Sequence, residues 1–139
     1  NETNALILKN SIFNENATIG VQCCGIDYIY PKENFEIYNK LKEKGLIISE
    51  YPNEYFPEKT KIPFCNRIIA GVSKMVLVIE ENEKNTINFI VNYALDFGKE
   101  VGAIPHDIND GDILCNQIIK SGGMLVNDAK DILEAYSLE

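Results

Sequence analysis

Arginine and histidine are almost absent from this chain, and tryptophan is missing altogether. Its 139 residues hold one arginine, Arg67, and one histidine, His106. The cysteines form no C-x-x-C pair, and His106 has no cysteine close to it in the sequence. Because zinc sites are built from closely spaced cysteines and histidines, we expect no metal site.

The motifs of the common nucleotide-binding and hydrolytic enzymes are also lacking. The sequence contains no G-x-G-x-x-G, no G-x-x-x-x-G-K-[ST] and no G-x-S-x-G, which excludes the standard dinucleotide, triphosphate and serine-hydrolase sites. Acids and bases that could act in catalysis stand at predicted strand ends. They are Asp27, Glu50, Glu80, Glu81 and His106. Without a nucleophile beside them, we expect no enzymatic activity and no cofactor.

No apolar run approaches the ~20 residues that span a membrane. Acidic residues outnumber basic ones by 21 to 13, which gives a net charge of −8. This balance argues against indiscriminate binding to a polyanion, so any contact with nucleic acid has to be local. The four cysteines are compatible with a reduced, cytoplasmic protein. They are Cys23, Cys24, Cys65 and Cys115.

Predicted strands alternate with predicted helices along the whole chain. Apolar runs predict strands at 17–21, 46–50, 75–80, 100–104 and 124–126. Helical periodicity and caps predict helices over 2–13, 32–44, 84–97, 113–121 and 128–136. Because the strands are apolar throughout, the pattern indicates one α/β domain over residues 1–139, with about five parallel strands and helices on both faces of the sheet.

The most informative stretch is 62–73, in which Asn66 and Arg67 stand before a short predicted helix. The residues from Tyr51 to Pro63 are expected to form a long loop that ends at the proline. An arginine at such a loop, beside the free N–H groups of a helix N-terminus, suits a phosphate or a carboxylate. Pairing of Arg67 with a surface carboxylate is the alternative.

Four stretches of the sequence resemble the DNA-processing protein A family (DprA, also called Smf), bacterial proteins of natural transformation. The matching stretches are Thr18-Ile19-Gly20-Val21 with Gly25-Ile26-Asp27, Tyr30-Pro31 and Asn34; Leu46-Ile47-Ile48-Ser49-Glu50-Tyr51-Pro52; Pro63 with Asn66-Arg67-Ile68-Ile69-Ala70-Gly71-Val72-Ser73; and Gly98-Lys99-Glu100-Val101 through Pro105. Their order and spacing cover nearly the whole chain, and the block from Asn66 to Ser73 is specific.

The resemblance implies a Rossmann-like fold that binds single-stranded DNA, hands it to the RecA recombinase and forms a homodimer. The residues expected to contact phosphates are Arg67, Asn66, Lys61, Lys59 and Gly25. Aromatic residues of the 51–63 loop are expected to stack on bases, although packing against the domain is their alternative role. These are Tyr51, Tyr55 and Phe56. The expected dimer contacts are Ile113, Leu114 and Ile118.

The sequence departs from the family pattern at several points. Cys65 stands where the family has a second arginine, and a glycine-rich stretch that precedes the matching region in the family is not in this sequence. We therefore expect the chain to be the C-terminal part of such a domain, divergent or truncated. Two other functions remain open: a phosphoribohydrolase-like nucleotide enzyme or sensor, and a dimerisation domain without a ligand.

Overall fold

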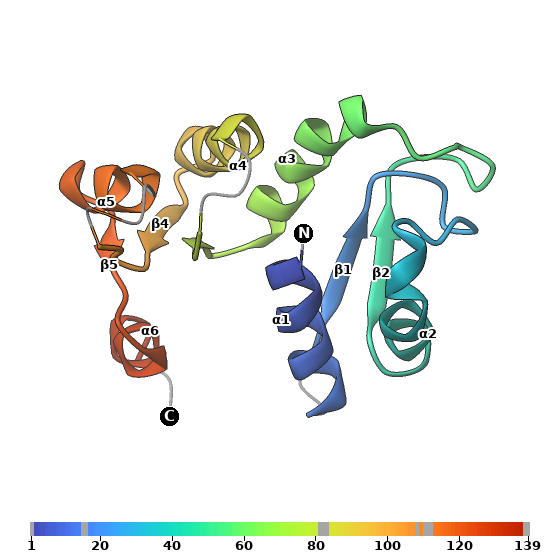
Figure 1. Ribbon diagram of the computed structural model, residues 1–139, viewed down its shortest axis with the longest axis horizontal. Helices are drawn as coiled ribbons and strands as arrows, with labels where there is room; N and C mark the ends of the chain where they lie inside the picture. The colour runs from blue at the N-terminus through green and yellow to red at the C-terminus, as the bar shows by residue number, and fades with distance from the viewer. Residues whose placement is uncertain (1, 15–16, 81–83, 108, 110–112, 138–139) are drawn as a thin grey trace. The chain divides into compact units, whose positions relative to one another are not determined.

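The computed structural model describes residues 2–14, 17–80, 84–107, 109 and 113–137. The chain packs as two compact units, Asn1–Cys65 and Asn66–Glu139, which we call the first and the second unit. Each is an α/β arrangement with parallel strands (Figure 1). None of the helices in the described ranges has the length and apolar character that a membrane span requires.

The first unit holds a pair of parallel strands and two α-helices. Its elements in chain order are α1 (Glu2–Phe13), β1 (Ile19–Gln22), the 3-10 helix η1 (Lys32–Asn34), α2 (Phe35–Lys44), β2 (Leu46–Ser49) and the 3-10 helix η2 (Lys59–Lys61). Ile19 lies opposite Leu46, and Gln22 lies opposite Ser49. The carboxyl ends of both strands therefore meet at one edge, where the loops that follow them lie together.

The core of the first unit is small and lies where α1 meets α2. It consists of Ile12, Ile37 and Leu41, with Ala5, Leu8 and Ile47 packed against it. The all-apolar pattern of residues 17–21 predicts burial of this strand, but the start of β1 is not buried, because 53% of Ile19 is exposed. A two-stranded sheet has two edges and no inner strand, so apolar residues at its ends keep contact with solvent.

The second unit is a three-stranded parallel sheet with helices packed on it. The helix α3 (Ile62–Val72) begins at the end of the first unit and continues into the second. The other elements are β3 (Met75–Val78), α4 (Lys84–Asp96), β4 (Glu100–Ala103), α5 (Ile113–Lys120), β5 (Met124–Leu125) and α6 (Ala129–Ala135). The strand order is β3-β4-β5. The core joins α3, α4 and α5 to the sheet through Ala70, Val76, Val78, Ala94, Val101, Ala103, Cys115 and Ile118.

The last helix is held by its cap and by a contact to β4. The Asp128 carboxylate accepts a hydrogen bond from the Lys130 N–H at 2.7 Å, and the Asp131 carboxylate accepts one from the Asp128 N–H at 3.3 Å, as part of a capping box. The Tyr136 hydroxyl donates to Glu100 Oε2 at 2.7 Å. This hydrogen bond raises the pKa of Tyr136, since it favours the protonated phenol beside a carboxylate.

The predicted parallel α/β fold is confirmed, and the described residues contain the five predicted strands, which form two sheets where the sequence predicts one. Most predicted bounds agree with the observed ones to within two residues. The exceptions are α2, which begins at Phe35 after the 3-10 turn Lys32–Asn34, and α3, which begins at Ile62, earlier than expected. Pro63 therefore lies in its first turn, where a missing N–H removes no helical hydrogen bond, and does not end the preceding loop.

Candidate nucleic-acid interface

Two loops interlock at the carboxyl ends of β1 and β2. The Gly25 N–H donates to Tyr55 O at 2.8 Å, and the Tyr55 N–H donates to Pro52 O at 2.9 Å. Ser49 at the end of β2 donates its hydroxyl to Cys24 O at 2.7 Å. Gly25 is buried at this crossing. Its N–H, which a phosphate contact would need, is thus used within the protein.

Polar side chains fix the turn that follows β1. Gln22 Nε2 donates to Gly25 O at 2.8 Å and also to Tyr28 O. From α2, the Tyr38 hydroxyl donates to Ile26 O. Burial, followed by the negative charge of Asp27, raises the pKa of Tyr38. The turn is therefore held by Gln22 from β1 and by Tyr38 from α2, neither of which the sequence analysis identifies. A glutamine at the end of an apolar strand could have indicated such a role.

The aromatic residues of the two loops form two pairs. Tyr51 and Tyr55 are stacked, with ring centroids 4.7 Å apart and an interplanar angle of 23°. Phe56 packs on Tyr28 with centroids also 4.7 Å apart, at a tilt of 37°. Phe56 is 68% exposed, whereas both stacked tyrosines are half-buried. Of the three predicted stacking residues, Phe56 thus offers the most surface to a ligand.

Tyr51 also lies close to two thiols, those of Cys23 and Cys65. Burial, together with the neighbouring Cys65 and Glu50, raises the pKa of Tyr51 to about 12. Cys65 Sγ lies 3.9 Å from Gln22 O and shares a side-chain hydrogen bond with Cys23. That bond, followed by burial, raises the pKa of the Cys23 thiol. The end of β1 is in this way connected to the first turn of α3.

The predicted phosphate contacts fall on both sides of the division between the units. Lys59 and Lys61 belong to η2 in the first unit, whereas Asn66 and Arg67 belong to the second unit. Lys59 and Arg67 are exposed and Lys61 is half-buried. Asn66 is only 8% exposed, which leaves its amide little surface for a ligand.

The prediction that Arg67 stands at a helix N-terminus is wrong. Because α3 begins at Ile62, the N–H groups without helical partners belong to its first turn and not to Arg67. Arg67 lies further along, inside the helix. The chain runs directly from η2 into α3, and this short segment carries three cations: Lys59, Lys61 and Arg67.

At the carboxyl edge of the second sheet, one asparagine of α5 fixes the loop after β4. Asn116 Oδ1 accepts from the His106 N–H at 3.1 Å, and Asn116 Nδ2 donates to His106 O at 2.8 Å. His106 Nε2 lies 2.6 Å from Ile79 O. Since a carbonyl oxygen only accepts, Nε2 carries the proton of this contact. His106 therefore joins the loops after β3 and β4.

The proposed acids and bases are divided between the two units. Asp27 and Glu50 are exposed residues of the first unit, and Glu80 is half-buried in the second. Glu81 lies outside the described residues. Within the described part of the chain, no three His, Cys, Asp or Glu side chains are arranged to hold a metal ion.

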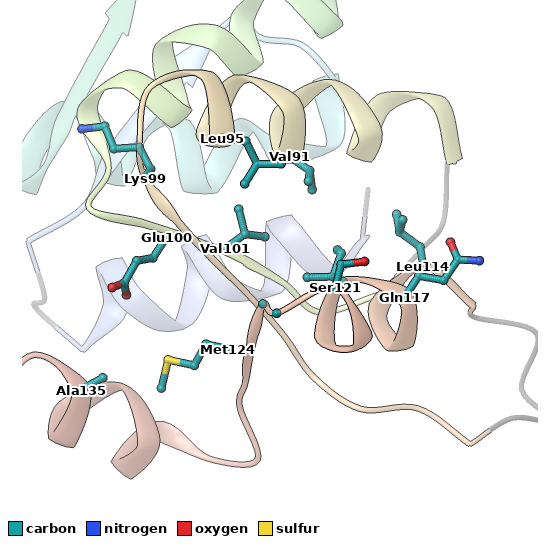
Figure 2. A pocket seen from close by; sticks show the side chains of 13 residues that line it. Val91, Leu95, Lys99, Glu100, Val101, Leu114, Gln117, Ser121, Met124 and Ala135 are labelled. Carbon is teal, nitrogen blue, oxygen red and sulfur yellow. The ribbon is translucent and has the colours of Figure 1, made fainter.

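An apolar groove of about 780 Å³ opens in the second unit between α4, α5 and the strands beneath them. Figure 2 shows Val91 and Leu95 of α4 extending toward Val101 of β4. Two of the predicted dimer contacts, Leu114 and Ile118, line this groove. Ile118 is otherwise part of the core, and Ile113 is the first residue of α5.

The sequence profile of the DNA recombination-mediator protein A family matches residues 4–137. The chain belongs to this family. It is 35% identical over 128 residues to DNA processing protein DprA of Bacillus subtilis, covering 89% of this chain and 42% of that protein. It is 34% identical over 124 residues to DprA of Streptococcus pneumoniae, covering 88% of this chain and 44% of that protein. It thus spans less than half the length of these two relatives.

Solved structures of the family have the same fold. The X-ray structure of DprA from Streptococcus pneumoniae superimposes with a TM-score of 0.82 at 32% identity, over 91% of this chain and 45% of that one. DNA processing protein A from Helicobacter pylori, a protein with a single-stranded DNA binding mode, gives a TM-score of 0.78 at 17% identity, over 97% and 72% of the two chains. The second likeness bears on the fold alone.

Proposed function

We propose that this chain is a single-stranded-DNA-binding part of a DprA-type protein, which acts in natural transformation and passes DNA to the RecA recombinase. The observation that carries the proposal is the segment from Phe56 to Arg67, in which exposed cations follow an exposed aromatic ring. Cations that contact phosphates and aromatic rings that stack on bases are the two elements of single-strand binding. Passage of DNA to RecA requires this binding, so a wild-type chain that does not bind the oligonucleotide would contradict both parts of the proposal.

The proposal assigns the residues different roles. Arg67, Lys61 and Lys59 contact phosphates, and Phe56 stacks on a base. Gly25 and Asn66 support the loops and the helix from within, because the Gly25 N–H is donated to Tyr55 O and Asn66 is buried. The action is binding without catalysis. A cytoplasmic location fits both RecA as partner and the four cysteines, which form no disulfide.

Replacing Arg67 with alanine tests the phosphate contacts. We expect affinity for a labelled oligothymidylate to fall roughly fivefold at 0.1 M salt, and the salt slope of the binding constant to flatten by about 0.7, the increment of one phosphate on a single strand. The measurement is a fluorescence-anisotropy titration at several salt concentrations. Lys130→Ala on α6, which removes an equal charge at another exposed position, is the control. An unchanged slope for Arg67→Ala would sink the assignment.

We further propose that the chain forms a homodimer through the groove between α4 and α5. The support is the apolar lining, which includes Leu114 and Ile118, and the 62% exposure of Leu95 at the same groove. Sedimentation equilibrium is expected to give twice the 15.7 kDa monomer mass for the wild-type chain and the monomer mass for Leu95→Asp. Leu133→Asp, an exposed position of α6 outside the groove, is expected to stay dimeric. Dimers of Leu95→Asp would contradict this surface.

A further inference from the structure

Two cysteines far apart in the sequence meet in the first unit. Cys23 follows β1 directly, and Cys65 lies in the first turn of α3. A side-chain hydrogen bond joins the two thiols. Cys65 Sγ is also 3.9 Å from the carbonyl oxygen of Gln22, the residue before Cys23. Cys65 therefore contacts both the backbone at the end of β1 and the thiol of Cys23.

The two thiols differ in their access to solvent. Cys65 is fully buried, whereas Cys23 is half-buried. Cys23 is therefore the residue of the pair that keeps contact with solvent. An accessible thiol backed by a second one is the arrangement in which an oxidised sulfur is resolved inside the protein.

Cys24 is directed elsewhere, although it is the neighbour of Cys23 in the sequence. Its sulfur lies 3.1 Å from Gln22 Nε2 and 3.9 Å from Tyr28 O, within the turn after β1. The fourth thiol, Cys115, lies 3.8 Å from Val78 O in the second unit. The chain thus supplies a matched control thiol beside the pair and a second one in the other unit.

We propose that Cys23 and Cys65 are a redox modification site that forms a reversible disulfide with a low-molecular-weight disulfide as oxidant. The Cys23 thiolate attacks one sulfur of the oxidant, and one small thiol leaves. The Cys65 thiolate then attacks Cys23 Sγ of the mixed disulfide, and the second small thiol leaves. Two protein thiols lose two electrons and two protons, and the oxidant is reduced to two thiols.

Oxidation changes what surrounds the pair. The bond fixes the first turn of α3, two residues before Arg67, to the end of β1. It also takes the Cys65 thiol out of its contact with Tyr51, which is stacked on Tyr55. Because Cys23 is hydrogen-bonded to a second thiol and its pKa is raised, the reaction is expected to accelerate as the pH rises above neutral.

The test is mass mapping of the full 139-residue chain after incubation with oxidised glutathione and blocking of the remaining thiols. We expect a cross-link, reversed by dithiothreitol, between tryptic peptide 10–32, which holds both Cys23 and Cys24, and tryptic peptide 62–67, which holds Cys65. Cys24→Ser is expected to retain this cross-link, and Cys23→Ser is expected to lose it. In the wild-type chain, fragmentation of the linked peptide between Cys23 and Cys24 assigns the sulfur, so this result does not depend on the folding of any variant or on DNA binding.

Three results would overturn the proposal. These are a cross-link through Cys24 or Cys115, a stable glutathione adduct on Cys23 with Cys65 still free, and four thiols that all remain reduced. None of them bears on the DNA-binding proposal, which the Arg67 titration tests in reduced protein.

Discussion

Replacing Gly25 with alanine is expected to lower the free energy of unfolding by about 2–4 kcal/mol, the range of a severe steric defect in a packed site. A Cβ atom on this residue would lie 2.0 Å from Asn53 O and 2.4 Å from Pro52 O. Both are backbone atoms, which cannot turn aside as a flexible side chain does. The alanine would therefore separate the two loops and break the 2.8 Å hydrogen bond from the Gly25 N–H to Tyr55 O.

Urea unfolding followed by circular dichroism measures this effect. Gly71→Ala on α3 is the matched control, because the nearest heavy atom to its added Cβ would be Phe97 Cε2 at an ordinary 3.8 Å. It is expected to leave stability unchanged or raise it by up to about 1 kcal/mol through the helix preference of alanine. A Gly25→Ala protein with the unfolding midpoint of the wild type would contradict the close approach of the loops.

The Gly25 contact also separates what the sequence could predict from what it could not. The local pattern predicts a turn at Gly25, because a glycine before Ile-Asp follows an apolar run. The reason for the glycine lies in Asn53, which reaches it only after α2 and β2 have been placed. A phosphate contact and a close backbone approach both favour glycine, and the sequence alone does not distinguish them.

Elements with strong local signals were predicted well. The α6 helix begins where Asp128 predicted it, because a cap is a contact between residues a few positions apart. The start of α3 differs from the prediction, because Pro63 is compatible both with the end of a loop and with the first turn of a helix. As a result, Arg67 lies inside α3 and not at the predicted helix N-terminus.

Pairs distant in the sequence were beyond prediction. The Cys23–Cys65 contact and the Tyr28–Phe56 pair depend on how β1, β2 and α3 pack. Hydrophobic periodicity fixes which face of an element is apolar, but not which residue of another element it meets. The sequence places Phe56, Tyr51 and Tyr55 in one loop and does not distinguish them. The structure shows that the two tyrosines stack on each other and that the Phe56 ring is exposed.

Removing the Phe56 ring is therefore expected to have the largest effect on DNA binding. A base stacked on an aromatic side chain contributes about 1–3 kcal/mol, so Phe56→Ala should weaken binding of an oligothymidylate by roughly 5- to 100-fold. Phe56→Tyr, which keeps the ring, should stay close to the wild type. Stacking involves no counterion, so the salt slope should stay unchanged, in contrast to Arg67→Ala. The measurement is the same anisotropy titration at several salt concentrations.

The control for Phe56 is Phe89→Ala on α4, another exposed phenylalanine, in the second unit. It removes the same side chain from a second exposed position and is expected to bind as the wild type does. Circular dichroism of Phe56→Ala is expected to retain the wild-type spectrum, because the ring contributes one contact, to Tyr28, at an exposed position. An equal loss of affinity in both variants would mean that the effect is general. Wild-type affinity in Phe56→Ala would remove Phe56 from the interface and leave binding to the cations from Lys59 to Arg67.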